Sequence, residues 1–369
     1  MCYNRVVKLI AQVKLTPTKE HHQALVKTLE SVNDAANYIS ERGWETATFR
    51  QYDLHRLLYY DIRSRFNLTA QIVVRVLAKV ADAYKPNRRV KRVFNRYGGI
   101  AYDKRILSWK VADQFVSIWT LDGRLKIPFV AGDRQLQLLC HLSGEADLVY
   151  RDGYFYLFQT CEVEEPPEGN PGEFLGIDLG IKNIAADSDG QFYSGGQVNG
   201  LRKRHAKLRA KLQSKNTKAS KRLLKKRSKK ERRFATHVNH VISKSVVAKA
   251  KGTERGIALE DLKGIRSRTV VRRSQRRQHH SWAFYQLRKF IEYKAKLAGV
   301  LVALVDPGHT SQTCPACGTI DKRNRPSQSL FSCVSCGFSS PADTVAAGNI
   351  SRRALVNEPC FSPAPSGVG

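Results

Sequence analysis

Long apolar runs are missing from this sequence. Its 369 residues contain no stretch of about 18 consecutive apolar residues, the length that a membrane-spanning helix needs. The longest apolar run, at 299–305 (GVLVALV), has the size of a strand. The N-terminal residues also lack the apolar core and the cleavage site of a secretory signal peptide. These absences exclude a membrane-spanning segment and predict a cytoplasmic protein without a membrane partner.

Acidic residues are also few. The chain has 32 Asp and Glu against 63 Lys and Arg, which gives a formal net charge of +31. Cationic side chains at this density repel one another unless a polyanion neutralises them. Nucleic acid is the favoured partner, because binding many phosphates releases counterions. A basic protein that is merely soluble is the less favoured alternative.

The eight cysteines do not have the pattern of a disulfide framework. Four are clustered late in the chain, and four are scattered along it (Cys2, Cys140, Cys161 and Cys360). In a reducing compartment, thiols of this kind remain unpaired. The pattern therefore predicts one metal site together with free thiols.

The clustered cysteines have the spacing of a zinc site. Two Cys-x-x-Cys pairs, Cys314/Cys317 and Cys333/Cys336, are separated by fifteen residues. A glycine follows each pair (CPACG and CVSCG), which lets the chain turn so that backbone N–H groups face sulfur. Four thiolates suit tetrahedral Zn²⁺ and leave no open position, so the predicted zinc is structural rather than catalytic. A redox function is less favoured, since it usually needs one such pair in a thioredoxin-like setting.

The first 161 residues show three successive apolar patterns: a strand, then helices, then short alternating runs. Residues 6–15 alternate like a strand, and apolar residues then recur at helical spacing over 17–40, with Thr16 as the expected N-cap. Further helices are expected over 52–65 and after Leu68. Short alternating runs then predict an antiparallel β unit, with strands at 114–121, 124–130, 135–141, 147–150 and 154–161. Pairing of strand 6–15 with this unit would make the helices an insertion into a β-barrel.

A segment rich in acid, Pro and Gly at 162–173 predicts a linker and a domain boundary. Three short strands are expected to follow as a meander, at 174–180, 182–186 and 191–193, with Asp187 and Asp189 in its turn. The later pattern predicts further helices and strands: helices over 234–250, 282–297 and 343–355, and strands over 256–262 and 300–305.

The most basic segment is 201–233. It contains 17 Lys or Arg and a single acid, Glu231, and its sparse leucines predict a helical hairpin. Little neutralisation within the segment is available, so contact with nucleic-acid phosphates is favoured over a merely solvated face. Aromatic residues such as Tyr59, Tyr60 and Trp282 offer base stacking, although packing in a core is the simpler explanation, above all for Trp282.

Three acids stand in positions that need an explanation. Asp178 lies inside the apolar strand FLGIDLG, where a charge without a partner or metal is costly. Glu260 lies in GIALEDL, where alternation puts it on the face opposite to Ile257. Asp261 is then on the other face or at the strand end, and we do not expect it to act with Glu260. Asp343 begins a helix of small residues, where an N-cap is the simpler role.

The three acids form a recognisable set when they are taken together. Three carboxylates can hold two Mg²⁺ ions about 4 Å apart, which is the arrangement for two-metal phosphodiester hydrolysis. One ion would lower the pKa of an attacking water, and the other would stabilise the leaving 3′ oxygen. Mg²⁺ prefers carboxylate oxygens and keeps several waters. Asp306 is a further candidate acid.

The C-terminal half resembles the TnpB family, the RNA-guided nucleases of small insertion sequences that are related to compact type V CRISPR effectors. GIDLGIKNIAADSDG at 176–190 resembles the first RuvC motif of the family, and IALEDLKGI at 257–265 resembles the second. The segment 282–317 resembles the lead into the family's zinc ribbon. CVSCGFSSPADTVAAGNI at 333–350 resembles the end of that ribbon and the third RuvC motif.

The resemblance implies an α/β RuvC (ribonuclease H-like) nuclease domain with an inserted zinc ribbon, preceded by a wedge β-barrel that a helical recognition domain interrupts. By motif position, Asp178, Glu260 and Asp343 would be catalytic acids that bind two Mg²⁺ ions, with Mn²⁺ as a possible substitute. The clustered cysteines would bind one structural Zn²⁺ (Cys314, Cys317, Cys333 and Cys336). The implied partners are a guide RNA and a double-stranded target DNA beside a short motif, with one protein copy per RNA.

The implied domains have these boundaries: wedge barrel 1–16 and 97–161, helical insertion 17–96, linker 162–173, nuclease domain 174–309 and 340–355, zinc ribbon 310–339, and a flexible tail 356–369. One departure concerns the third motif, which in the family reads Asp-x-Asn-Ala-Ala-x-Asn-Ile. Val345 stands in the place of its first Asn. Because the acid itself is retained, we still expect cleavage.

Three other functions compete with an RNA-guided DNA endonuclease. A catalytically weak or inactive RNA-guided DNA-binding repressor is the main alternative, but the complete set of three acids favours the enzyme. A transposase that joins strands itself is a second alternative, and the ribbon between the second and third motifs argues against it. A basic zinc-ribbon binding module without activity would leave the ordered acids unexplained.

Overall fold

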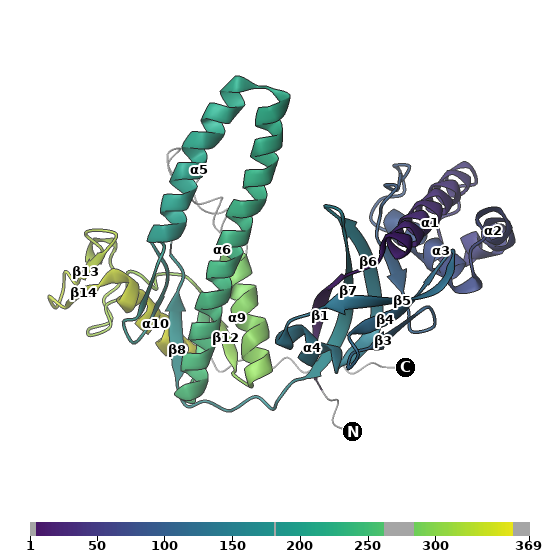
Figure 1. Cartoon of the computed structure of the whole chain (residues 1–369). Helices are drawn as coiled ribbons and strands as arrows, with labels where there is room; N and C mark the ends of the chain where they lie inside the picture. The colour runs from purple at the N-terminus through teal and green to yellow at the C-terminus, as the bar shows by residue number, and fades with distance from the viewer. Residues whose placement is uncertain (1–4, 181, 262–283, 357–369) are drawn as a thin grey trace. The chain divides into compact units, whose positions relative to one another are not determined.

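The computed structural model describes residues 5–180, 182–261 and 284–356 (Figure 1). The chain divides into two compact units, Met1–Glu164 and Glu165–Gly369, which are called unit 1 and unit 2 below. Each unit has its own buried apolar core. No helix among the described residues is both long enough and apolar enough to cross a membrane.

Unit 1 is a seven-stranded sheet with three helices inserted after its first strand. The sheet order is β2-β6-β7-β1-β5-β4-β3, and β1 pairs antiparallel with both β7 and β5. The predicted pairing of strand 6–15 with the later strands is therefore confirmed. The elements are β1 (Val6–Leu15), α1 (Lys19–Glu45), α2 (Gln51–Phe66), α3 (Ala70–Tyr84), β2 (Ile100–Tyr102), β3 (Leu107–Lys110), β4 (Phe115–Thr120), β5 (Gly123–Val130), α4 (Asp133–Leu139), β6 (Leu142–Arg151) and β7 (Tyr154–Glu164).

The start of α1 differs from the prediction by two residues. The Thr18 hydroxyl, rather than that of Thr16, accepts the backbone N–H of His21 at 3.2 Å and caps the helix. Thr16 instead extends the pairing with β5, because its backbone N–H and its hydroxyl both donate to the Pro128 carbonyl, at 2.8 and 3.1 Å. Thr16 therefore pairs with a strand residue 112 positions away instead of capping α1.

The strand expected at 135–141 is wrong, because α4 occupies that region. The run QLQLL fits a strand and a short helix equally well, since apolar periodicity does not separate the two over so few residues. Gly132 as N-cap and Asp133 in the first turn support the helix, and Leu139 is buried. The local pattern therefore allowed either a strand or a helix, and the packing of Leu139 favours the helix.

Unit 2 contains a five-stranded sheet of mixed direction. Its order is β10-β9-β8-β11-β12, in which β8, β9 and β10 are antiparallel neighbours and β8, β11 and β12 are parallel neighbours. The expected meander at its start is confirmed. The elements are β8 (Phe174–Asp178), β9 (Asn183–Asp187), β10 (Phe192–Ser194), α5 (Gly196–Lys215), α6 (Lys218–Gly252), β11 (Gly256–Glu260), α9 (Phe284–Ala298), β12 (Val302–Val305), η1 (Lys322–Asn324), β13 (Leu330–Ser332), β14 (Ser339–Pro341) and α10 (Ala342–Val356).

The two faces of this sheet bury different helices. Leu175, Ile177 and Leu259 pack with residues of α6 and α9. On the other face, Phe174 and Ala258 pack with Ile350 of α10. This alternation agrees with the predicted orientation of strand 256–262, whose odd-numbered residues were expected on one face.

Gly176 allows α10 to approach the sheet. A Cβ atom added at this position would overlap the Ala347 carbonyl oxygen and the Ser351 backbone nitrogen. The Ser351 hydroxyl also donates to the Phe174 carbonyl at 2.5 Å. Only a glycine at position 176 permits this close packing of helix on strand.

The turn after β9 is anchored to the end of α6. The Asp187 carboxylate accepts the backbone N–H groups of Asp189 and Gln191, as expected for a turn residue, and also pairs with Lys249 at 2.5 Å. Arg255 donates two hydrogen bonds to Asp189, at 2.9 and 2.6 Å. These ion pairs give both acids structural roles.

Candidate functional site

The register of two parallel strands brings two of the predicted acids together. β8 and β11 pair with Ile177 opposite Leu259, so the next residues, Asp178 and Glu260, end neighbouring strands at the same edge. Alternation places Asp178 on the face of Gly176, toward α10. The side chains of these two acids are half-buried.

The third acid comes from the helix that covers this face. Asp343 lies in the first turn of α10 and directly follows Ala342, the first residue of that helix. Its carboxylate accepts a hydrogen bond from the Asn183 amide at 2.8 Å and lies 3.7 Å from the guanidinium of Arg325. The strand ends and the helix start thus supply the three acids from 166 residues of sequence, 178–343.

Burial and like charge make Asp178 hard to ionise. Burial first, and then the charges of Glu260 and Asp343, raise the pKa of Asp178 to about 7. Burial also raises the pKa of Glu260, although the Thr310 hydroxyl opposes that shift by donating to its carboxylate at 2.6 Å. Carboxylates that repel one another in a partly buried site favour a cation between them.

The donor set of these acids fits a hard divalent ion. Asp178, Glu260 and Asp343 offer only carboxylate oxygens, which are the ligands that Mg²⁺ prefers. In the part of the chain that the structure describes, the four cysteines are the one group of three or more side chains gathered closely enough to hold a metal ion, with their sulfurs within 4.8 Å of one another. The carboxylate oxygens of Asp178, Glu260 and Asp343 are not gathered in this way.

Several polar residues of the acidic site had not been singled out from the sequence. Thr310 holds Glu260, and Asn183 holds Asp343. Arg325 follows η1 in the segment that carries the four cysteines (310–339, called the cysteine-bearing segment below). Its charge lowers the pKa of both Asp178 and Glu260. Asn183 lies within the first motif (176–190), which was an available signal. Nothing local marked Arg325 among the many basic residues.

The remaining acids near the site have other surroundings. Asp261 accepts a hydrogen bond from Arg288 of α9 at 2.7 Å, which agrees with the expectation that it does not act with Glu260. Asp306 follows β12, and its charge raises the pKa of Glu260. Asp306 is therefore close enough to Glu260 to act on it electrostatically.

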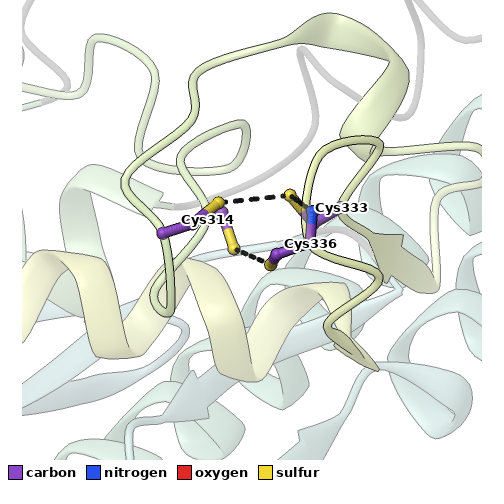
Figure 2. A group of neighbouring side chains, drawn as sticks. Cys314, Cys333 and Cys336 are labelled. Atoms are coloured by element: carbon purple, nitrogen blue, oxygen red, sulfur yellow. Dashed lines mark hydrogen bonds between the residues drawn. The ribbon is translucent and has the colours of Figure 1, made fainter.

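The four clustered cysteines converge as the sequence predicts. Cys314 and Cys336 have sulfur atoms 3.6 Å apart, and the sulfurs of Cys317 and Cys333 are 3.5 Å apart. Figure 2 shows Cys333 and Cys336 facing Cys314 across this cluster. Four Zn–S bonds of about 2.3 Å in a tetrahedron separate the sulfurs by roughly 3.8 Å, so the cluster fits one Zn²⁺.

Backbone turns shape each cysteine pair. Gly318 and Gly337 have φ angles of 75° and 73°, which favour glycine. Their N–H groups donate to the carbonyls of Cys314 and Cys333, at 3.0 and 3.1 Å. A hydrogen bond with Thr319 lowers the pKa of the Cys317 thiol to about 6, which favours the thiolate that metal binding needs.

The predicted basic hairpin consists of α5 and the first part of α6, and it extends well beyond the sheet of unit 2 in Figure 1. Its single acid, Glu231, accepts from Arg209 at 2.8 Å and ties the two helices together. Most of its Lys and Arg side chains with described exposure are exposed. Tyr60 in unit 1 is 81% exposed, whereas Trp282 lies outside the described residues.

Two family models match the chain. A model described as the Cas12f1-like TNB domain matches residues 284–350, which include all four clustered cysteines and Asp343. A model described as "Probable transposase" (OrfB_IS605) matches residues 158–264, which include Asp178 and Glu260. The two matches thus divide the acidic site between them.

Known proteins resemble this chain over different spans. A CRISPR-associated endodeoxyribonuclease Cas12f1 of Sulfoacidibacillus thermotolerans is 40% identical over 118 residues, or 32% of this chain, and the match spans only 26% of that relative. A solved Cas12f1–sgRNA–target DNA complex has a TM-score of 0.59 at 12% identity, covering 94% of this chain and 98% of that one, which is a likeness of fold. A TnpB-like protein of Methanocaldococcus jannaschii is 33% identical over 201 residues, or 50% of this chain and 71% of the relative. Because this relative is more than 30% identical and is matched over more than two thirds of its length, the chain belongs to the TnpB-like family.

Proposed function

We propose that this protein is an RNA-guided, Mg²⁺-dependent DNA endonuclease, with Asp178, Glu260 and Asp343 as the ligands of two metal ions. The observation that carries the proposal is the parallel register of β8 and β11, which ends both strands in a carboxylate beneath the first turn of α10. The repulsion that raises the pKa of Asp178 to about 7 is the repulsion that bound cations would relieve.

The chain's residues would position the acids and the substrate. Bound ions would supply an activated water and stabilisation of the leaving 3′ oxygen. Thr310 fixes the orientation of Glu260 through its hydroxyl, and Asn183 fixes that of Asp343 through its amide. Arg325 places a positive charge beside Asp343, where it would attract a phosphate of the scissile strand.

The four-cysteine site would have a structural role. Cys314, Cys317, Cys333 and Cys336 would bind one Zn²⁺, because their sulfurs are gathered tightly and fill all four positions. No position is left for a water or a substrate. Hydrolysis would therefore belong to the acidic site alone.

The fold supports a domain assignment for each unit. The mixed sheet of unit 2, with α10 on one face and α6 and α9 on the other, would be the RuvC-type nuclease domain (174–309 and 340–355), and 310–339 would be its zinc ribbon. The sheet of unit 1 would be the wedge barrel (1–16 and 97–161), with 17–96 as the helical recognition insertion. The segment 162–173 would link them.

The partners would be a guide RNA and a double-stranded DNA that the guide matches. The solved Cas12f1 complex of similar fold holds an sgRNA and a target DNA, and the net charge of +31 suits two polyanions. The exposed cations of α5 and α6 would contact phosphates, which adds affinity rather than sequence choice. We propose one protein copy per RNA.

Cleavage of a plasmid library tests this function. The protein, purified with its co-expressed flanking RNA, would be mixed with Mg²⁺ and plasmids that carry a randomised stretch beside a guide-matched target. We expect the wild type to cut and Asp178→Ala and Glu260→Ala to fail. Asp261→Asn is the matched control, because this neighbouring acid pairs with Arg288 and should leave cleavage largely intact.

The same assay separates the main alternative. Tight, RNA-dependent binding of the target without any cut would contradict the nuclease and favour a DNA-binding repressor. Cuts that persist in both acid variants would place the chemistry elsewhere in the chain. Cuts only with Mn²⁺ would keep the acidic site and change its preferred ion.

A further inference from the structure

Helix α10 belongs to two cores at once. Its later residues Ile350 and Ala354 pack on the nuclease-type sheet against Phe174 and Ala258. Its first turn packs on the cysteine-bearing segment instead, where Ala342 and Val345 join a separate cluster of buried residues (Cys314, Phe331 and Cys333, with Phe338 beside them). Asp343 lies between Ala342 and Val345 in the chain. The acid therefore sits on the part of the helix that the cysteine site supports.

Both ends of the cysteine-bearing segment also touch the acidic site. At its start, Thr310 donates to Glu260 at 2.6 Å and lies four residues before Cys314. At its end, β14 runs directly into α10 and pairs with β13. Asn349 of α10 closes the arrangement, because its amide donates to the carbonyls of Thr310 and Thr313, both at 2.8 Å.

Val345 is the apolar contact in this arrangement. Its side chain is 5% exposed and lies in the same cluster as two of the four cysteines. It stands where the family motif has an Asn, yet an apolar side chain in an apolar cluster has no ligand role. Val345 is thus a residue of α10 that packs against the cysteine-bearing segment.

We infer that the four-cysteine site and the acidic site are energetically coupled through the first turn of α10, so that zinc binding raises the affinity of the acids for divalent cations, with Val345 as a positioning residue. The inference rests on the proposed function only in taking Asp178, Glu260 and Asp343 as metal ligands. It adds a regulation of that site, since loss of zinc would weaken binding of the catalytic ions.

The size of the cluster explains the coupling. Five buried residues are too few to hold two cysteine turns together, so the metal would supply most of the folding free energy of this segment. Without zinc, the first turn of α10 loses its packing partner, and Asp343 loses its fixed position. Thr310 loses its anchor beside Cys314 at the same time. Coupling between two sites is reciprocal, so a divalent ion on the acids should equally tighten zinc binding.

Two metal titrations on the full-length, RNA-free protein test the inference. Tb³⁺ luminescence reports cation binding at the acids in zinc-loaded and zinc-depleted protein, and Asp178→Asn identifies the signal that belongs to the acidic site. We expect zinc removal to weaken this Tb³⁺ binding about tenfold, within the range typical of coupled sites. The reciprocal titration measures zinc affinity by chelator competition, and we expect Mg²⁺ to tighten it by the same factor.

A pair of variants on one helix locates the coupling. Val345→Ala removes the contact with the cysteine cluster, so the Mg²⁺ effect on zinc affinity should shrink at least threefold. Ile350→Val is the matched control, because it trims a side chain on the sheet-facing part of α10 and should leave that effect unchanged. The reciprocal arm uses zinc-loaded, folded protein, so it gives a result even if zinc-depleted protein unfolds.

Two results would overturn the inference. One is a zinc affinity that is the same with and without Mg²⁺ while Tb³⁺ still binds the acids. The other is a Val345→Ala variant that keeps the full effect. Failure of the proposed function looks different, because Tb³⁺ binding would then be insensitive to Asp178→Asn.

Discussion

Asp178 carries a large electrostatic cost in the acidic site. Its pKa of about 7 reflects burial and two neighbouring carboxylates, and the opposing charge of Arg325 does not offset them. Thr310 and Asn183 serve the other two acids, each through one hydrogen bond. At the scale of single residues, the site is therefore poised to bind cations.

The first prediction concerns the stability of the Mg²⁺-free, zinc-loaded protein. The native state binds the Asp178 proton more tightly than the unfolded chain, so the free energy of unfolding falls as pH rises from about 4 to about 7. Asp178→Asn has no such proton, and its stability relative to wild type should rise over this window by roughly 1–4 kcal/mol. Urea denaturation at pH 5 and pH 8 measures the change, and an equal difference at both pH values would contradict it.

The second prediction concerns Thr310. In the proposed nuclease, Thr310→Val removes the hydroxyl that fixes Glu260. The cleavage rate should then fall about 10- to 100-fold, as is typical when a residue that orients a metal ligand is lost. Thr310→Ser keeps the hydroxyl and should retain most of the activity. Single-turnover cleavage compares the two, and similar rates for Val and Ser would remove Thr310 from the site.

At the scale of elements, the approach of α10 to β8 decides whether the acids meet. Gly176 makes this approach possible, because any side chain there would collide with the Ala347 carbonyl. The parallel register of β8 and β11 sets two acids, and the packing of α10 sets the third. An error in either element would separate them.

The third prediction tests the approach of α10. Gly176→Ala should destabilise the protein by about 1–3 kcal/mol or more, because backbone rather than a flexible side chain must shift. Gly200→Ala is its counterpart, since Gly200 lies inside α5 with open space around it and should stabilise by about 0.5–1 kcal/mol. Thermal denaturation compares both with wild type, and a neutral Gly176→Ala would refute the close packing.

The fourth prediction concerns the basic hairpin. Lys203, Lys207 and Lys211 lie four residues apart along α5 and are exposed. If they contact phosphates, replacing all three with Ala should flatten the dependence of log K on log salt by roughly 2–3. The triple Lys→Arg variant keeps the charge and should keep the slope. Binding of an unrelated duplex at several salt concentrations gives the slope, and an unchanged slope in the Ala variant would exclude the contacts.

At the scale of the whole molecule, the chain is two units with separate cores. The boundary falls at Glu164, where β7 ends, so the first three residues of the expected linker belong to a strand. Residues 166–170 are exposed and lie outside regular secondary structure. Each unit can therefore be described by its own packing.

The fifth prediction concerns this boundary. Brief digestion with a glutamyl endopeptidase should cut first near Glu168, because exposed, irregular backbone is the preferred site of nicking. Two resistant fragments should result, each containing one core. Mass spectrometry identifies the first cut, and early cleavage at Glu260 or Glu292, which are not exposed, would contradict the described packing.

The sequence alone determined much of this protein. Periodicity located the helices of unit 1 and the hairpin of unit 2, since these elements are long and regular. The cysteine spacing predicted one cluster, because four thiols at this separation have few other uses. The alternation around Glu260 correctly separated its face from that of Ile257. Each of these signals is local in the chain.

Only the tertiary structure decided the rest. Whether Thr16 or Thr18 caps α1, and whether QLQLL is a strand, depended on partners far away in sequence. Arg325 and Thr310 became part of the acidic site through contacts that span 18 and 50 residues. Val345, which departs from the family motif, is a packing residue. Such roles depend on which surfaces meet, and local sequence patterns do not encode that choice.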